Sequence, residues 1–284
     1  MSIWEALILG IVQGITEFLP VSSSGHLVLL QKIFGITEPV MLFDTAVHGG
    51  TLVAVLVVLR QDILNILRRI FQPLTLFIIA GTIPIVIAGL LFKDHIENAF
   101  TSGTFLCFAF LITSALLFLS EKFFRRSQAF GFLDRLEEGP PSEKFQDNMT
   151  IPDALFIGIF QAVAILPGIS RSGATISAGL FRGLNRDFAA RFSFILSIPA
   201  ILGALVLQVM DLFKTDALHG AGNPGGVGLL PMAVGVISAA IAGFFSIRIT
   251  LKIVKERSLF GFALYTGILG VLVLIDRFWT NFFF

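Results

Sequence analysis

Six stretches of the chain are long and apolar enough to cross about 30 Å of hydrocarbon as helices. They cover residues 41–59, 74–92, 101–120, 192–210, 227–246 and 258–275. The composition agrees with this pattern, because 55% of the 284 residues are hydrophobic and only 14% are charged. Ordinary soluble domains carry about 25% charged residues. The sequence therefore predicts an all-α integral membrane protein with six transmembrane helices.

Four further stretches predict helices that are too short or too polar to cross a membrane alone. They cover about 3–18, 22–34, 152–166 and 171–183. The first contains Gln13 and Glu17, and the third is broken by a Pro-Gly pair. Broken backbone is tolerated at membrane depth only where protein or a water-filled cavity surrounds it. We therefore expect two re-entrant helical hairpins, each of which enters the membrane and turns back.

The two halves of the chain share one order of elements, a hairpin followed by three spans. The motif GIxQ at 10–13 recurs at 158–161, and SxSG at 22–25 recurs at 170–173. Because three spans are an odd number, the second half must enter the membrane from the opposite side. This predicts an inverted-topology repeat.

We expect a single membrane domain with three parts. The first repeat covers 1–120, an aqueous cytoplasmic loop with at most a short helix covers 121–150, and the second repeat covers 151–284.

The placement of charge predicts an orientation. Of the 20 Lys and Arg residues, 15 fall in loops on one side, at 60–73, 121–150, 182–191 and 247–257, and four fall on the other side. By the positive-inside rule the first group is cytoplasmic. Both termini then lie outside the cytoplasm, and the turns of the two hairpins can meet near the membrane midplane.

The turn of the first hairpin reads QGITEFLPVSSSGH, from Gln13 to His26. Gln13 and Glu17 are four residues apart and share one face of a helix. After the proline, Ser22 is a good N-cap for a new helix. On that helix Ser23 and His26 are three residues apart, so they can touch.

The turn of the second hairpin reads PGISRSGAT, from 167 to 175. Ser170 is the expected N-cap, and Arg171 and Thr175 share a helical face. Two helix N-termini that converge inside a membrane form an anion site, because each offers free N–H groups and partial positive charge. The arginine adds a planar cation that can grip two phosphate oxygens. An intramembrane arginine is costly and indicates function.

Several of these residues also have structural interpretations. Ser23 could be a helix-packing hydroxyl, His26 could simply be hydrogen-bonded, and Glu17 could pair with Arg171. Asp44 and His48 share one face of a span. They could line a cavity, but packing against a hairpin is the role we favour for them.

Both motifs together resemble the undecaprenyl-diphosphate phosphatase family of the bacitracin-resistance type, and the resemblance covers essentially the whole chain. It implies an inverted-repeat fold with re-entrant helices. It also implies removal of the terminal phosphate from undecaprenyl diphosphate, which recycles the lipid carrier of bacterial cell-wall synthesis and gives bacitracin resistance. The expected location is the bacterial cytoplasmic membrane, with the active site open to its outer side.

The resemblance also suggests roles for individual residues. The candidate catalytic residues are Glu17, Ser23, His26 and Arg171. The candidate substrate-binding residues are Gln13, Ser22, Ser170, Ser172, Gly173 and Thr175. Some family members carry Glu where this chain has Gln13, so a carboxylate role does not transfer to that position.

Ser23 would attack the outer phosphorus and His26 would take its proton, with direct attack by water as the competing mechanism. Because Glu17 repels a diphosphate, we expect a weakly held Mg²⁺ or Ca²⁺ to bridge the two. The expected partners are the lipid substrate, the bilayer and, as an open alternative, a second copy in a homodimer, with no nucleic acid. The competing function is a transporter or flippase of a lipid phosphate or organic anion, because inverted repeats with broken helices also build transporters.

Overall fold

The computed structural model describes residues 1–36, 40–92, 105–134, 148–214 and 227–280, and every element within them is helical. The helices are α1 (Ile3–Phe18), α2 (Ser23–Ile33), α3 (Met41–Val58), α4 (Arg60–Arg68), α5 (Pro73–Leu91), α7 (Leu106–Asp134), α8 (Ile151–Val163), α9 (Arg171–Phe181), α10 (Arg186–Lys214), α11 (Leu229–Glu256) and α12 (Phe260–Ile275), followed by the π-helical turn η2 (Asp276–Thr280). The all-α prediction is confirmed for the described part of the chain.

Six of these helices, α3, α5, α7, α10, α11 and α12, are long and apolar enough to cross a membrane. They coincide with the six predicted spans, and the chain is therefore a multi-pass membrane protein. Three of the spans extend beyond the prediction. Helix α10 runs from Arg186 to Lys214 where 192–210 was expected, and α11 continues to Glu256 where an end at 246 was expected. Helix α7 continues to Asp134, well into the segment that was expected to be a loop with at most a short helix. The short amphipathic helix α4 was not predicted at all. Residues 135–147 of the expected loop lie outside the described residues.

A buried carboxylate explains why α7 continues beyond its apolar stretch. Glu121 is fully buried and accepts hydrogen bonds from Arg125, one turn further along α7, and from Arg186 of α10, each at 2.7 Å. It also accepts the backbone N–H of Leu259 at 3.1 Å. A buried charge needs such partners, and together they join α7, α10 and the start of α12 at one end of the molecule.

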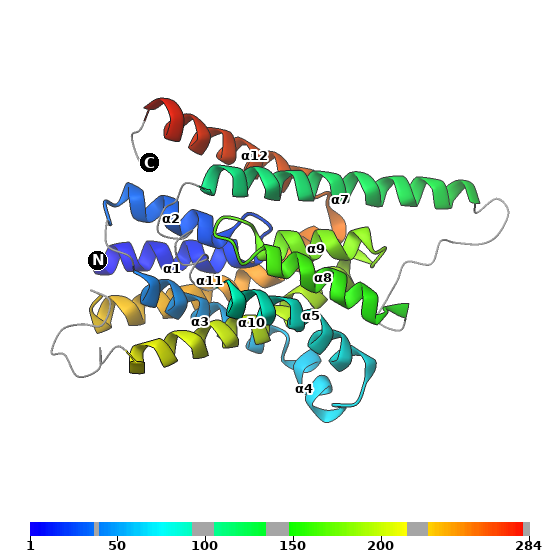
Figure 1. Cartoon of the computed structure of the whole chain (residues 1–284), viewed down its shortest axis with the longest axis horizontal. Helices are drawn as coiled ribbons and strands as arrows, with labels where there is room; N and C mark the ends of the chain where they lie inside the picture. Colours follow the sequence, from blue (N-terminus) through cyan, green and yellow to red (C-terminus); the bar gives the residue numbers. More distant parts are fainter. Residues whose placement is uncertain (37–39, 93–104, 135–147, 215–226, 281–284) are drawn as a thin grey trace.

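Helices α1 with α2 and α8 with α9 form two antiparallel hairpins that approach the centre of the molecule from opposite ends (Figure 1). Their helices have only 16, 11, 13 and 11 residues. The longest therefore measures about 24 Å at 1.5 Å per residue, less than the hydrocarbon thickness. This arrangement agrees with re-entrant hairpins. Their depth in the bilayer and the inverted relation of the two halves stay predictions, as does the division into repeats.

Each hairpin is held by close packing of its first helix on a span from the other half of the chain. Helix α1 lies along α11, and α8 lies along α5. The contacts depend on glycine, because a Cβ at Gly14 would meet the carbonyl oxygen of Ala239 at 2.5 Å, and one at Gly158 would meet that of Gly81 at 2.4 Å. Small residues of this kind let helices in membranes approach closely. The two turns are thereby fixed against each other.

Candidate active site

The turn between α1 and α2 is built by its serines. Ser22 caps α2, with its Oγ accepting the N–H of Gly25 at 3.2 Å, and Ser170 caps α9 in the same way, accepting the N–H of Gly173 at 3.0 Å. Both N-cap predictions are therefore confirmed. Ser22 has φ of 72°, which makes it the one non-glycine residue with positive φ in the described part of the chain. Such backbone is strained for a residue with a side chain and is found most often at functional sites.

The turns of the two hairpins touch each other directly. The N–H of Gly168 donates to Ser24 Oγ at 3.1 Å, and Ser172 Oγ donates to the carbonyl of Leu19 at 3.0 Å. The backbone N–H of Ser170 donates in turn to Thr113 of α7 at 3.0 Å. The predicted convergence of the two motifs is thus confirmed, and the N-termini of α2 and α9 lie close together in the interior of the helical bundle.

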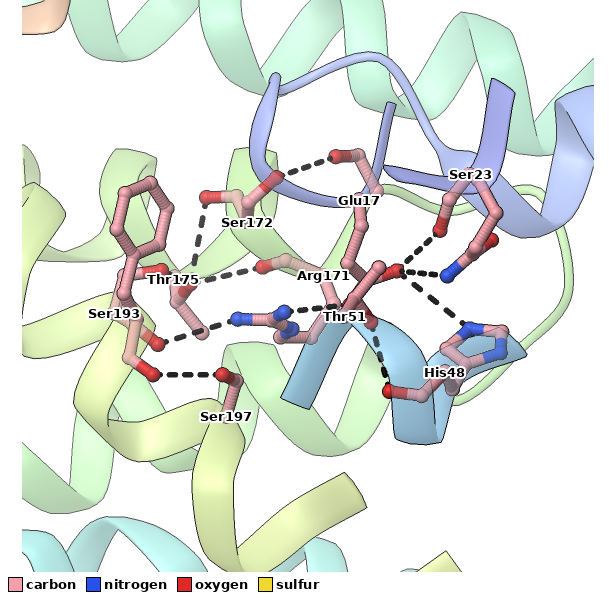
Figure 2. Close-up of polar contacts among 12 residues, drawn as sticks. Glu17, Ser23, His48, Thr51, Arg171, Ser172, Thr175, Ser193 and Ser197 are labelled. Carbon is pink, nitrogen blue, oxygen red and sulfur yellow. Dashed lines mark hydrogen bonds and ion pairs between the residues drawn. The ribbon is translucent and has the colours of Figure 1, made fainter. Parts of the chain in front are cut away.

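Glu17 is the centre of the polar cluster formed there (Figure 2). Its side chain is 5% exposed, and its Oε1 accepts from Arg171 Nη2 at 2.7 Å. Its Oε2 accepts from the Ser23 hydroxyl at 2.6 Å and from the Gln13 amide at 3.0 Å. These donors offset the free-energy cost of removing the Glu17 carboxylate from water. The ion pair between Glu17 and Arg171 is therefore present, and the catalytic role of Glu17 stays a prediction.

Arg171 is held from its other side by α10. Its Nη1 donates to the carbonyl of Ser193 at 3.2 Å, and its side chain is 14% exposed. Thr175, one turn further along α9, donates to the Arg171 carbonyl at 2.8 Å and shares a hydrogen bond of 2.6 Å with Ser193 Oγ. The guanidinium thus has a fixed orientation, and Ser193 belongs to the site although the motifs gave no sign of it.

Two buried phenyl rings fix the backbone beside this cluster. Phe18 follows Glu17 in the chain and Phe194 follows Ser193, and both rings are fully buried. They meet edge to face with their centroids 5.3 Å apart. Because each ring is adjacent in sequence to a polar residue of the site, their packing holds the end of α1 against α10.

The ring nitrogens of His26 are hydrogen-bonded to other partners than Ser23, contrary to the expected pairing of these two residues. Its Nδ1 is 2.6 Å from the carbonyl oxygen of Ser22, and its Nε2 is 2.7 Å from the hydroxyl of Tyr265 on α12. The Ser23 hydroxyl is instead bonded to Glu17. Ser23 lies at the first position of α2, from which its side chain reaches back across the turn to α1. The group that accepts the hydrogen bond of the candidate nucleophile is therefore the Glu17 carboxylate.

A second histidine takes part in the cluster. Nε2 of His48 lies 3.5 Å from Glu17 Oε2, and the imidazole is 28% exposed. Its Nδ1 is bonded to the carbonyl of Asp44 at 2.6 Å, while the Asp44 carboxylate accepts from Gln31 of α2 at 2.7 Å. We favoured a packing role for this pair. The structure places His48 against the carboxylate of the site and Asp44 against the second helix of the hairpin.

The donor set around Glu17 bears on whether the site could hold a resident metal ion. No group of three or more His, Cys, Asp and Glu side chains that could hold a metal ion occurs among the described residues. Both oxygens of Glu17 are already engaged by Arg171, Ser23 and Gln13. These side chains do not fit a resident metal ion. A Mg²⁺ or Ca²⁺ that arrives with the substrate stays a prediction.

Together, the fold and the cluster define a multi-pass helical membrane protein in which a buried carboxylate meets a partly buried hydroxyl and arginine at two helix N-termini. The sequence model described as bacitracin resistance protein BacA matches residues 6–272. The chain belongs to this family.

Three relatives illustrate how far the similarity extends. A protein of Carboxydothermus hydrogenoformans named undecaprenyl-diphosphatase is 48% identical over 275 residues, which is 97% of either chain. Undecaprenyl-diphosphatase 3 of Bacillus cereus is 41% identical and covers 96% of this chain and 97% of its own. An undecaprenyl-diphosphatase of Methanosphaera stadtmanae is 39% identical and covers 97% of this chain and 98% of its own.

Proposed function

We propose that this chain is an undecaprenyl-diphosphatase, which hydrolyses undecaprenyl diphosphate to undecaprenyl phosphate and inorganic phosphate and so recycles the lipid carrier of cell-wall synthesis. One observation carries the proposal beyond the names of the relatives. The Ser23 hydroxyl lies 2.6 Å from the Glu17 carboxylate, which is itself 2.7 Å from Arg171, at the meeting point of two helix N-termini. A nucleophile, a base and a phosphate-binding cation are thereby brought together.

The diphosphate binds where Arg171 and the capped ends of α2 and α9 face each other. Arginine binds phosphate through two parallel hydrogen bonds, and its partner Ser193 keeps the guanidinium plane in place. An arriving phosphate competes with Glu17 for Arg171, since both are anions. Once the guanidinium turns to the substrate, the carboxylate has lost its strongest partner and is free to take a proton.

The chemistry follows from the contact between Ser23 and Glu17. The Ser23 proton passes to Glu17 Oε2 as Oγ attacks the terminal phosphorus, and the bond to the bridging oxygen breaks to release undecaprenyl phosphate. Glu17 passes this proton to the leaving oxygen of undecaprenyl phosphate and becomes a carboxylate again. Water then attacks the phosphoserine and gives a proton to Glu17, which returns it to Ser23 Oγ as the serine–phosphorus bond breaks and inorganic phosphate leaves. Arg171 and the helix N-termini stabilise the charge on the transferred group.

The finer features of this function are proposals as well. The protein lies in the bacterial cytoplasmic membrane with its active site open to the outer side, as the distribution of basic residues predicts. Bacitracin resistance accords with the name of the family. A substrate-borne Mg²⁺ or Ca²⁺ and a homodimer remain part of the proposal and await measurement.

The test is phosphate release from undecaprenyl diphosphate by purified protein in detergent. The wild type should release one phosphate per lipid and leave undecaprenyl phosphate, whereas an Arg171→Ala preparation made in parallel controls for contaminating phosphatases. Absence of release by a folded wild type, combined with movement of a lipid phosphate across vesicles, would overturn the proposal in favour of the transporter.

A further inference from the structure

His26 has a partner on each ring nitrogen, and these partners fix its tautomer. A carbonyl oxygen only accepts hydrogen bonds, so Nδ1 carries the proton that it shares with the Ser22 carbonyl at 2.6 Å. In the neutral imidazole Nε2 is then an acceptor, and the Tyr265 hydroxyl donates to it at 2.7 Å. Both hydrogen bonds suit a neutral ring, and neither is directed at the reacting groups.

Tyr265 is well placed for this contact. Its ring lies nearly parallel to the His26 imidazole, with an interplanar angle of 11° and centroids 5.7 Å apart, while Phe110 of α7 meets the same imidazole edge-on. Tyr265 is the only tyrosine in the chain and belongs to α12, at the far end of the sequence from the first hairpin. The hydrogen bond between His26 and Tyr265 joins residues 239 positions apart and links the last span to the turn that carries Ser23.

The chain of contacts ends at the strained residue of the turn. His26 holds the carbonyl of Ser22, whose φ of 72° is unfavourable for a residue with a side chain. Ser23 follows directly and donates to Glu17 at 2.6 Å. Strain of this kind persists only where the surroundings fix it. The Ser22 carbonyl also accepts the backbone N–H of His26 at 3.2 Å, and the imidazole adds a second, shorter hydrogen bond of 2.6 Å to the same oxygen.

We propose that Tyr265 is a positioning residue for the phosphatase reaction: its hydroxyl orients His26, which holds the Ser22 backbone so that the Ser23 hydroxyl points at Glu17. This inference rests on the proposed function. It also gives His26 a task other than proton transfer, because an imidazole engaged at both nitrogens cannot also take the proton of Ser23.

The experiment compares Tyr265→Phe with the wild type in the phosphate-release assay. The variant keeps the stacked ring and loses only the hydroxyl. We expect kcat to fall about tenfold, the effect of losing one hydrogen bond, with KM within about twofold because Arg171 still binds the diphosphate. In a His26→Gln background the same change should alter kcat by less than about twofold, since Tyr265 acts through His26.

Thr266→Val is the matched control. It also removes a hydroxyl from α12, but one that bonds only to carbonyls of its own helix. We expect wild-type activity for this variant, and a melting temperature of Tyr265→Phe close to that of the wild type. An unchanged kcat in Tyr265→Phe, or an equal loss in both backgrounds, would overturn the inference and leave the proposed function intact. A wild type that releases no phosphate would instead contradict both the proposed function and the role of Tyr265.

A second measurement does not depend on activity. Because Tyr265 is the sole tyrosine, growth on 3-fluorotyrosine labels this position alone and gives a single ¹⁹F resonance. The resonance should move in His26→Gln and stay in place in Thr266→Val. A resonance that does not respond to His26→Gln would show that the two side chains are not in contact and would end the proposal, even where the double variant turns over too slowly to measure.

Discussion

At the scale of single residues, the role of the Ser23 hydroxyl distinguishes attack by serine from direct attack by water. This hydroxyl is bonded to Glu17, so it can act as the nucleophile or as a donor that orients the carboxylate. We expect Ser23→Ala to lower kcat by at least about 10³-fold and to leave KM within about threefold, because Arg171 still holds the substrate. Rapid quenching of wild-type reactions with labelled lipid diphosphate should trap phosphoserine at position 23. Rapid turnover by the variant, with no trapped phosphoserine, would assign the attack to water and make Glu17 its base.

Arg171 should not be replaceable by lysine. Its guanidinium serves Glu17 and the Ser193 carbonyl through two different nitrogens, and a point ammonium cannot reproduce that fork. We expect Arg171→Lys to lower kcat/KM by more than about tenfold. Arg182→Lys, at an ion pair with Asp153 outside the site, serves as the control and should stay near wild type. A loss within about threefold at Arg171, about 0.7 kcal/mol, would exclude it from transition-state binding.

The sequence predicted the residues that lie within the two motifs, assigned His48 to packing or to a cavity wall, and missed Ser193 and Tyr265. Local spacing placed Glu17, Ser23 and Arg171 at the two turns, because caps and helical faces are short-range properties. His48 and Tyr265 come from α3 and α12, and only tertiary packing brings them to the site. The wrong partner assigned to His26 has the same origin, because its ring is directed by a residue more than two hundred positions away.

At the scale of elements, the approach of α8 to α5 positions the second hairpin. A Cβ at Gly158 would lie 2.4 Å from the Gly81 carbonyl oxygen, and backbone cannot move aside as a side chain can. We expect Gly158→Ala to lower stability by about 1–3 kcal/mol and to reduce activity, because α8 carries the turn before Arg171. Gly203→Ala is the matched control, since nothing lies within 4 Å of its Cβ. Thermal unfolding in detergent measures both. Equal melting temperatures would mean that the helices can separate without cost.

The predicted elements agree with the structure wherever hydrophobicity alone decides. All six spans fall in the expected places, since their apolar length is a property of the local sequence. Helix α4 was missed because its amphipathic residues lie in a short polar segment between two spans. The continuation of α7 was missed because it depends on the ion pairs of Glu121. One is with Arg125 of the same helix, and the other is with Arg186 of α10, which is distant in sequence. Both misses concern elements whose stability comes from their neighbours.

At the scale of the whole molecule, orientation in the membrane determines which leaflet supplies the substrate. The excess of basic residues places both termini outside and α4 and the end of α11 in the cytoplasm. In a variant with buried Cys107 replaced by Ala, single cysteines at Ser2, Asn65 and Lys255 report on the two sides, because all three positions are exposed. An impermeant maleimide added to intact spheroplasts should label position 2, and should label 65 and 255 only after lysis. Labelling of 65 and 255 but not of 2 in intact spheroplasts would invert the topology and open the first hairpin to the cytoplasm. It would then require the diphosphate to be hydrolysed on the inner leaflet.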